Sequence, residues 1–137
     1  GVGTPPAAAR HASNFFAPPD CSFDTLGLDP RLVAAARRAG FEQPSQMQQL
    51  ALPQLLRLRE DGRAEDAIVT GETGSGKTLA YLLPVLHHLL SASQAGARAL
   101  VLLPSPALCE QVLDVTRSLA ADDGAPLVRA ELCGLAE

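Results

Sequence analysis

Lysine is almost absent from this sequence: of its 11 basic residues only Lys77 is a lysine, and the other ten are arginines. The 15 acidic residues give a formal net charge of −4 at pH 7. Lysine-rich histone-like or ribosomal-type binders are therefore excluded, because they neutralise many phosphates over a broad cationic surface. With 47% hydrophobic and 19% charged residues, most of the 137-residue chain is also too apolar to be disordered.

Cysteine and long apolar runs are scarce as well. Cys21, Cys109 and Cys133 are widely spaced and form no CxxC pair, which favours free buried thiols in a reducing compartment over a disulfide framework or a zinc site. The longest uncharged apolar stretch, 79–90, contains Pro84 and is too short to span a membrane. No apolar leader opens the chain, so we expect an intracellular protein; cytoplasm, nucleus and organelle are not distinguished.

The hydrophobic pattern divides the chain into a tail and one domain. Residues 1–22 hold four prolines and no sustained period, which predicts an extended or disordered tail. Phe15 and Phe16 lie in this tail, and the sequence leaves open whether they dock onto the rest of the chain. The pattern changes at Phe23, so the domain is expected to begin there and to occupy residues 23–137.

Two helices are expected before the centre of the chain. Asp29 is a natural N-cap with proline after it, and the apolar stripe that follows ends at Gly40, a natural helix stop. A second start signal at Ser45 precedes a stripe that extends to Leu56, which Pro53 is expected to break or kink.

The remainder alternates between strand and helix signals. Short apolar runs at 67–69, 99–103 and 127–128 predict strands, and stripes at helical spacing over 79–90 and 108–119 predict helices between them. This order implies right-handed crossovers and a parallel sheet flanked by helices. The fold class is therefore α/β.

Residues 71–78, GETGSGKT, fit the phosphate-binding pattern G-x-x-x-x-G-K-[ST]. The glycines let successive backbone N–H groups converge on an anion, and the helix that follows adds the positive end of its dipole. Lys77 would reach the β- and γ-phosphates, and the Thr78 hydroxyl would bind Mg²⁺. A chance match in a glycine-rich turn is the alternative, but the expected strand before the motif and helix after it favour nucleotide binding. The motif alone identifies neither the base nor the reaction.

Upstream, residues 40–48 read GFEQPSQMQ. Phe41 offers a ring on which a base can stack, and the Gln48 amide can both donate to and accept from the edge of a base. Taken alone, these residues fit an ordinary helix–loop–helix with a core phenylalanine better than a base site.

The combination of the two segments resembles the Q motif and phosphate loop of DEAD-box RNA helicases. Phe23, seventeen residues before Gly40, is similar to the lone upstream aromatic of that family. Residues 102–111 are similar to its P-T-R-E-L-A-x-Q motif, and Cys133-Gly134 stands where the family has a Gly-Gly pair. The resemblance covers about residues 23–134, and the Q motif is its most specific part.

The resemblance implies a P-loop NTPase: the N-terminal half of the first RecA-like domain, in which a parallel sheet is flanked by helices. It implies that Phe41 stacks on adenine and that Gln48 reads its edge. The residues expected to hold the phosphates and Mg²⁺ are Thr73, Gly74, Ser75, Gly76, Lys77 and Thr78. The implied partner is RNA, single-stranded or a short duplex, free or in a ribonucleoprotein complex. The region expected to contact it includes Pro104, Ser105, Gln111 and Gly134.

Three departures from the family pattern keep a second interpretation open. Pro106 and Ala107 replace the family's Arg and Glu, the charged loop 57–65 is longer than usual, and the D-E-A-D carboxylates are not among these residues. Asp114 and Glu131 are poorly placed to replace those carboxylates in hydrolysis. The alternative to an ATP-dependent RNA helicase is a degenerate helicase-like module with a structural or interaction role. A P-loop NTPase of another group, preferring GTP, is a third possibility.

Overall fold

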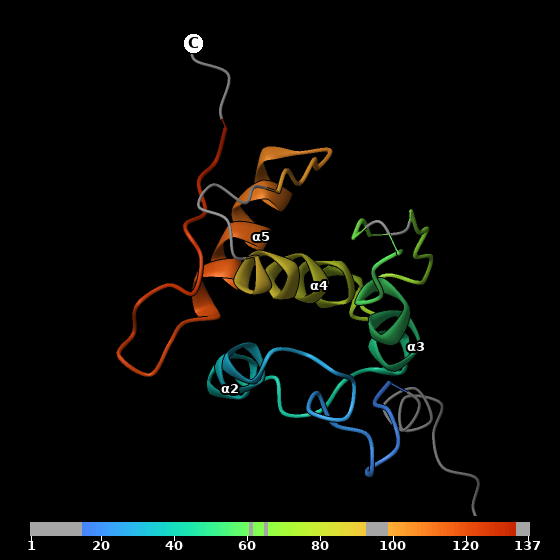
Figure 1. Ribbon diagram of the computed structural model, residues 1–137. Helices are drawn as coiled ribbons and strands as arrows, with labels where there is room; N and C mark the ends of the chain where they lie inside the picture. Colours follow the sequence, from blue (N-terminus) through green and yellow to red (C-terminus); the bar gives the residue numbers. More distant parts are fainter. Residues whose placement is uncertain (1–14, 61, 65, 93–98, 134–137) are drawn as a thin grey trace, which may run out of the picture.

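The computed structural model describes residues 15–60, 62–64, 66–92 and 99–133. Its helices are α2 (Pro30–Arg38), α3 (Gln46–Leu55), α4 (Lys77–Ser91) and α5 (Pro106–Ser118). Helix α4 occupies the centre, with α3 near one end, α5 near the other and α2 along one side (Figure 1). The helix that follows the phosphate loop is thus the element around which the others are arranged.

Helix α2 begins and ends at the residues that the sequence predicts. The Asp29 carboxylate accepts a hydrogen bond from the amide of Arg31 at 2.9 Å and so caps the first turn. Gly40 has a φ of +88°, a left-handed conformation that costs little only for glycine. The next amide, that of Phe41, donates to the carbonyl oxygen of Ala36 at 2.9 Å and closes the helix end. The turn at Gly40 therefore fixes where Phe41 leaves the helix.

Helix α3 begins with a reciprocal capping box. The Ser45 hydroxyl accepts from the amide of Gln48 at 3.2 Å, and the Gln48 side chain accepts from the amide of Ser45 at 2.9 Å. The helix continues through Pro53 and ends two residues later at Leu55, so the proline does not end it at once. Helix α5 begins in a similar way, with the Ser105 hydroxyl accepting from an amide of the first turn.

The core lies between α2, α3 and α4. Leu52 of α3 and Leu83 of α4 are fully buried, and they pack with residues of the segment before α2 and with Leu119 after α5. The buried members of this cluster are Phe23, Leu28, Leu32, Val33, Ala35, Ala36, Leu52, Leu79, Leu82, Leu83, Leu86 and Leu119. Burial of these side chains packs α4 against α3 and α2.

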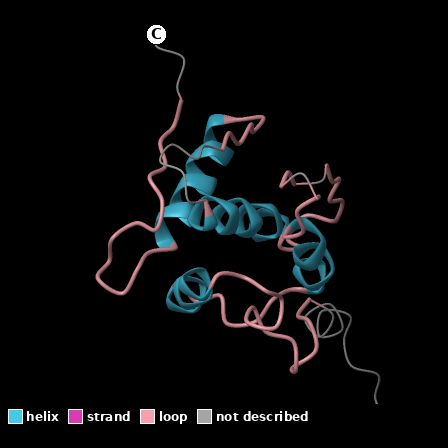
Figure 2. Ribbon diagram, in the orientation of Figure 1, coloured by secondary structure: helices cyan, strands magenta, loops and turns pink. Residues whose placement is uncertain are grey.

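The expected strands are not formed as paired strands in the described part of the chain, which consists of helices and loops apart from isolated bridges (Figure 2). Residues 67–69, 99–103 and 127–128 all lie in loop conformation. A strand is stabilised by hydrogen bonds to a neighbour, and these segments are not paired with one another. Some of their apolar side chains stay in water as a result: Ile68 is 92% exposed and Leu102 is 83% exposed, whereas Leu127 and Val128 are partly buried against the core.

The three cysteines are free, as predicted. Cys21 and Cys109 are half-buried, but Cys133 is exposed, so the expected burial is wrong at this position. None of the helices in the described ranges is both long and apolar enough to cross a membrane.

Candidate functional site

The phosphate-loop sequence 71–78 forms a tight turn that leads into α4. Gly74 and Gly76 have φ values of +80° and +90°, so both positions require the left-handed conformation that glycine adopts at little cost. Gly76 is also the N-cap of α4. The two glycines therefore reverse the chain immediately before the helix begins.

The ammonium group of Lys77 lies across this turn. It donates to the carbonyl oxygen of Gly71 at 2.6 Å and to that of Glu72. The side chain thus folds back over the loop that precedes it instead of extending into water. A compact positive charge is thereby held directly over the loop.

No side chain among the described residues caps the start of α4. The first amide of the helix to bond within it is that of Ala80, which donates to the Gly76 carbonyl oxygen at 3.1 Å. The N–H groups of the preceding turn have no acceptor within the helix, and the helix dipole makes this end positive. The helix end and Lys77 together form an environment suited to a multiply charged anion.

The start of α3 is bonded to the phosphate loop through two side chains. The Ser45 hydroxyl donates to the Ser75 carbonyl oxygen at 3.0 Å, and the Gln48 side chain donates to the Gly76 carbonyl oxygen at 3.1 Å. Ser45 is 1% exposed and Gln48 is 3% exposed. The same two residues form the capping box of α3, so one small polar group orders both the helix start and the loop.

Two glycines of the loop lie close to side chains at the start of α3. A Cβ atom at Gly76 would lie 2.7 Å from the Gln48 amide nitrogen and 2.8 Å from the Ser45 hydroxyl oxygen. A Cβ atom at Gly71 would lie 1.9 Å from the terminal methyl carbon of Met47. Gly76 is therefore needed for contact with the start of α3 as well as for the turn itself, because Ser45 and Gln48 are buried and hydrogen-bonded; at Gly71 the Met47 methyl is the free end of a flexible side chain and can move aside.

The sequence model of the DEAD/DEAH box helicase family matches residues 45–134, which begin at the serine of this contact. The chain belongs to the DEAD/DEAH box helicase family. The family has a RecA-like P-loop fold, so this coarser part of the fold prediction is confirmed.

Curated relatives support the same assignment. The chain is 43% identical over 103 residues to DEAD-box ATP-dependent RNA helicase 16 of Arabidopsis thaliana, covering 72% of this chain and 16% of that protein. It is 37% identical over 134 residues to DEAD-box ATP-dependent RNA helicase 22 of the same plant, covering 88% of this chain and 22% of that protein. It is 40% identical over 118 residues to ATP-dependent RNA helicase DBP9 of Kluyveromyces lactis, covering 82% of this chain and 19% of that protein. The chain thus spans about a fifth of the length of these relatives.

The other residues that the DEAD-box resemblance assigns to the nucleotide take varied positions. Phe41 is half-buried and packs against the core, while Thr73 and Gly74 are exposed on the loop. Thr78 is half-buried in the first turn of α4 and hydrogen-bonds Tyr81, whose pKa is raised by burial and lowered to a smaller extent by this bond. Among the described residues, the side chains of Ser45 and Gln48 donate the hydrogen bonds that join the Q motif to the loop backbone.

Three of the residues proposed to contact RNA lie just before α5 or within it. Pro104 and Gln111 are exposed, Ser105 is the N-cap, and Gly134 lies outside the described residues. Pro106, at the position of the family's Arg, is the first residue of the helix, where a missing N–H costs nothing. The turn into the helix is retained, and contact with RNA stays a prediction.

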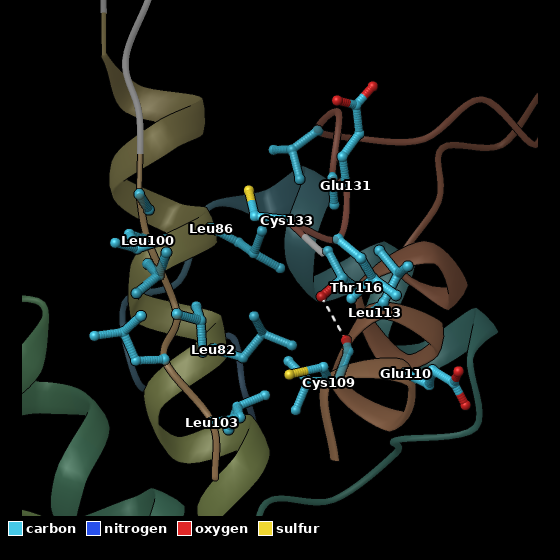
Figure 3. Close-up of a pocket in the computed structure, with 18 of the residues that line it drawn as sticks. Leu82, Leu86, Leu100, Leu103, Cys109, Glu110, Leu113, Thr116, Glu131 and Cys133 are labelled. Carbon is cyan, nitrogen blue, oxygen red and sulfur yellow. Dashed lines mark hydrogen bonds between the residues drawn. The ribbon is translucent and has the colours of Figure 1, made fainter. Parts of the chain in front are cut away.

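A cavity of about 580 Å³ lies between α4, α5 and the segments 99–104 and 128–133. Leu82 and Leu86 of α4 face Leu113 of α5 across it (Figure 3). The Thr116 hydroxyl is satisfied by the Val112 carbonyl oxygen at 2.7 Å. None of the described residues that line this cavity belongs to the phosphate loop, so it is a space beneath the uncovered apolar segments and not the nucleotide site.

Proposed function

We propose that this chain binds ATP with Mg²⁺ and forms the ATP-binding part of a DEAD-box-type RNA helicase. The observation that carries the proposal is the position of Lys77, held over a glycine turn whose carbonyls are bonded to the Q-motif residues Ser45 and Gln48. The loop and Lys77 can bind the phosphates, and Gln48, which is bonded to the same loop, can bind the base. Both ends of one nucleotide therefore have a binding partner.

In this proposal the backbone of 73–78 and the Lys77 ammonium bind the phosphates. The Thr78 hydroxyl would hold Mg²⁺ through one oxygen. Thr78 lies in the first turn of α4, directly after the glycine turn, which supports this assignment. Bound Mg²⁺ neutralises charge on the phosphates.

Adenine recognition is assigned to Phe41 and Gln48. The Gln48 amide oxygen already accepts from Ser45, and its nitrogen donates to Gly76. A carboxamide has two donor hydrogens and two acceptor lone pairs, so one of each remains for the edge of a base. Phe41 leaves the end of α2 half-buried, and its exposed part offers a stacking surface.

For the whole protein we infer ATP-driven remodelling of RNA or of RNA–protein complexes, since the similar plant and yeast proteins are named ATP-dependent RNA helicases. We also infer that 67–69, 99–103 and 127–128 are strands of a parallel RecA-like sheet and that 23–137 form part of the first RecA-like domain. Ile68 and Leu102 are apolar yet highly exposed, and apolar side chains are typical of strands in the interior of a parallel sheet, which supports this inference.

ATP binding and RNA-stimulated phosphate release by the intact gene product test the proposal. ATP turnover that rises with RNA supports the helicase. ATP binding without turnover would instead favour a degenerate module, which the replacement of the family's Arg and Glu by Pro106 and Ala107 supports. A preference for GTP would indicate another group of P-loop NTPases.

A further inference from the structure

A short segment ahead of the domain, residues 15–17, lies against the turn that starts α3. We call it the N-terminal strap. Phe16 forms an isolated antiparallel bridge with Ser45. The amide of Ala17 donates to the Pro44 carbonyl oxygen at 2.9 Å, and Ala17 is 3% exposed. The strap is therefore bonded to the Q-motif backbone itself.

Two further bonds complete the attachment. The carbonyl oxygen of Phe15 accepts from the amide of Gln46 at 2.9 Å. Gln46 is the first residue of α3, and its N–H is one of those that a helix leaves without an internal acceptor. From the other side, the Gln43 side chain donates to the Ala17 carbonyl oxygen at 2.6 Å. The strap and the Q motif are thus bonded in both directions.

These bonds converge on one residue of the candidate site. Pro44 and Gln46, which the strap holds, are the two neighbours of Ser45. Ser45 bonds the phosphate loop at Ser75 and pairs reciprocally with Gln48. Holding the backbone on both sides of Ser45 fixes the direction of its hydroxyl and of its amide.

We propose that the N-terminal strap is a positioning element for the nucleotide site: it sets Ser45 and Gln48 against the phosphate loop, with Gln43 as its side-chain anchor. The inference rests on the proposed ATP binding. None of the strap residues bonds the loop, so its effect passes through Ser45. We therefore expect the strap to alter ATP affinity and to leave the rate of the chemical step largely unchanged.

The test replaces Gln43 by glutamate in the intact protein, which keeps the shape and removes the donor to Ala17. The dissociation constant and the KM for ATP are expected to rise about 2- to 10-fold, the loss of one hydrogen bond, with kcat changed by less than about 2-fold. Gln54→Glu, an identical substitution at an exposed position of α3, is the matched control. Gln43→Lys restores an N–H donor and is expected to recover the affinity.

A second readout separates positioning from simple loss of stability. The amide of Gln48 bonds the Ser45 hydroxyl, so its hydrogen exchange is expected to become faster in Gln43→Glu while the thermal midpoint stays close to that of Gln54→Glu. Ala17→Pro, which removes the N–H donated to Pro44, is expected to have the same effect as Gln43→Glu by a different route.

Unchanged ATP affinity and unchanged Gln48 exchange in both strap variants would overturn the positioning role while leaving ATP binding intact. A lowered affinity that Gln54→Glu reproduces would overturn it as well. If the unaltered protein itself fails to bind ATP, the proposed function is wrong and this inference is wrong with it. That result is distinguished from the others because it is obtained without any variant.

Discussion

The Gln48 amide nitrogen and the Gly76 carbonyl oxygen lie 3.1 Å apart and are joined by a hydrogen bond. The same carbonyl oxygen accepts from the amide of Ala80, which opens the hydrogen-bond ladder of α4. The start of α3 and the start of α4 therefore share one acceptor in the phosphate loop. A change in the Gln48 side chain reaches the loop and the helix through one atom.

Replacing Gln48 by alanine is expected to weaken both stability and base selectivity. The substitution leaves the buried amide of Ser45 without its acceptor, which costs about 1–3 kcal/mol in the free energy of unfolding. It also removes the side chain assigned to the adenine edge, so the ratio of ATP to GTP affinity should fall. Urea unfolding and competitive nucleotide binding measure the two effects. Gln54→Ala, in the exposed part of α3, is expected to be neutral within about 0.5 kcal/mol; an unaltered nucleotide ratio in Gln48→Ala would contradict the adenine assignment.

Replacing Lys77 by alanine is expected to abolish nucleotide binding while the fold persists. A charge-assisted contact contributes about 1.5–3 kcal/mol, which alone corresponds to about 10- to 100-fold in affinity. The side chain bonds loop carbonyls and lies outside the buried core cluster, so circular dichroism should be unchanged. Arg57→Ala removes one exposed positive charge elsewhere and controls for net charge. Equal ATP affinity in the lysine variant and the parent would contradict the phosphate-loop assignment.

Gly76→Ala is expected to be more damaging than an alanine at another left-handed glycine. Both positions pay about 1–2 kcal/mol for the left-handed backbone. Only at Gly76 would the new Cβ also lie 2.7 Å from the Gln48 side chain. Gly62, with a φ of +78° and no neighbour within 4 Å, is the matched control. The loss of unfolding free energy in Gly76→Ala minus that in Gly62→Ala measures the cost of the clash between the loop and the start of α3. Equal losses would mean that the Gln48 side chain moves aside without cost.

Stability is expected to fall as the pH drops below about 6.5, the ordinary pKa of histidine. Burial, with a smaller contribution from His88, lowers the pKa of His87, and its neutral Nδ1 accepts from the amide of Asp29 at 3.0 Å. The unfolded chain takes up a proton at higher pH than the folded one, so the stabilisation is complete above 6.5 and decreases toward the lower folded pKa. Unfolding free energies measured from pH 8 to pH 5 test this. His87→Asn retains an acceptor that does not titrate, so it should remove this pH dependence of the unfolding free energy. If the pH dependence is the same in the variant, a group other than His87 causes it.

Local signals in the sequence were enough to predict both ends of α2 and the start of α3. Asp29 and Ser45 cap their helices within one turn, and Gly40 ends α2 through its own backbone conformation, so neighbouring residues contain the needed information. The expected strands at 67–69 and 99–103 depend on partners that are distant in sequence. Their apolar runs identify segments suited to a sheet interior but do not create the pairing.

The candidate site was predictable as two motifs but not as one contact. Lys77 and the glycines follow from the phosphate-loop pattern. Nothing in the sequence indicates that the Ser45 hydroxyl bonds Ser75, thirty residues away, because a serine before a helix is explained fully by capping. The hydrogen bond from the Gln43 side chain to the Ala17 carbonyl oxygen could not be predicted either, because it forms only when residues 15–17 lie against the turn before α3.

The uncovered apolar segments have a practical consequence for handling the chain. Leu100 and Leu102 face water on a segment with no strand neighbour among the described residues, and Ile68 does the same before the phosphate loop. Unpaired backbone beside exposed leucines is a template for edge-to-edge association between molecules. We expect this chain, produced by itself, to aggregate as its concentration rises, and light scattering would detect that before any activity is assayed.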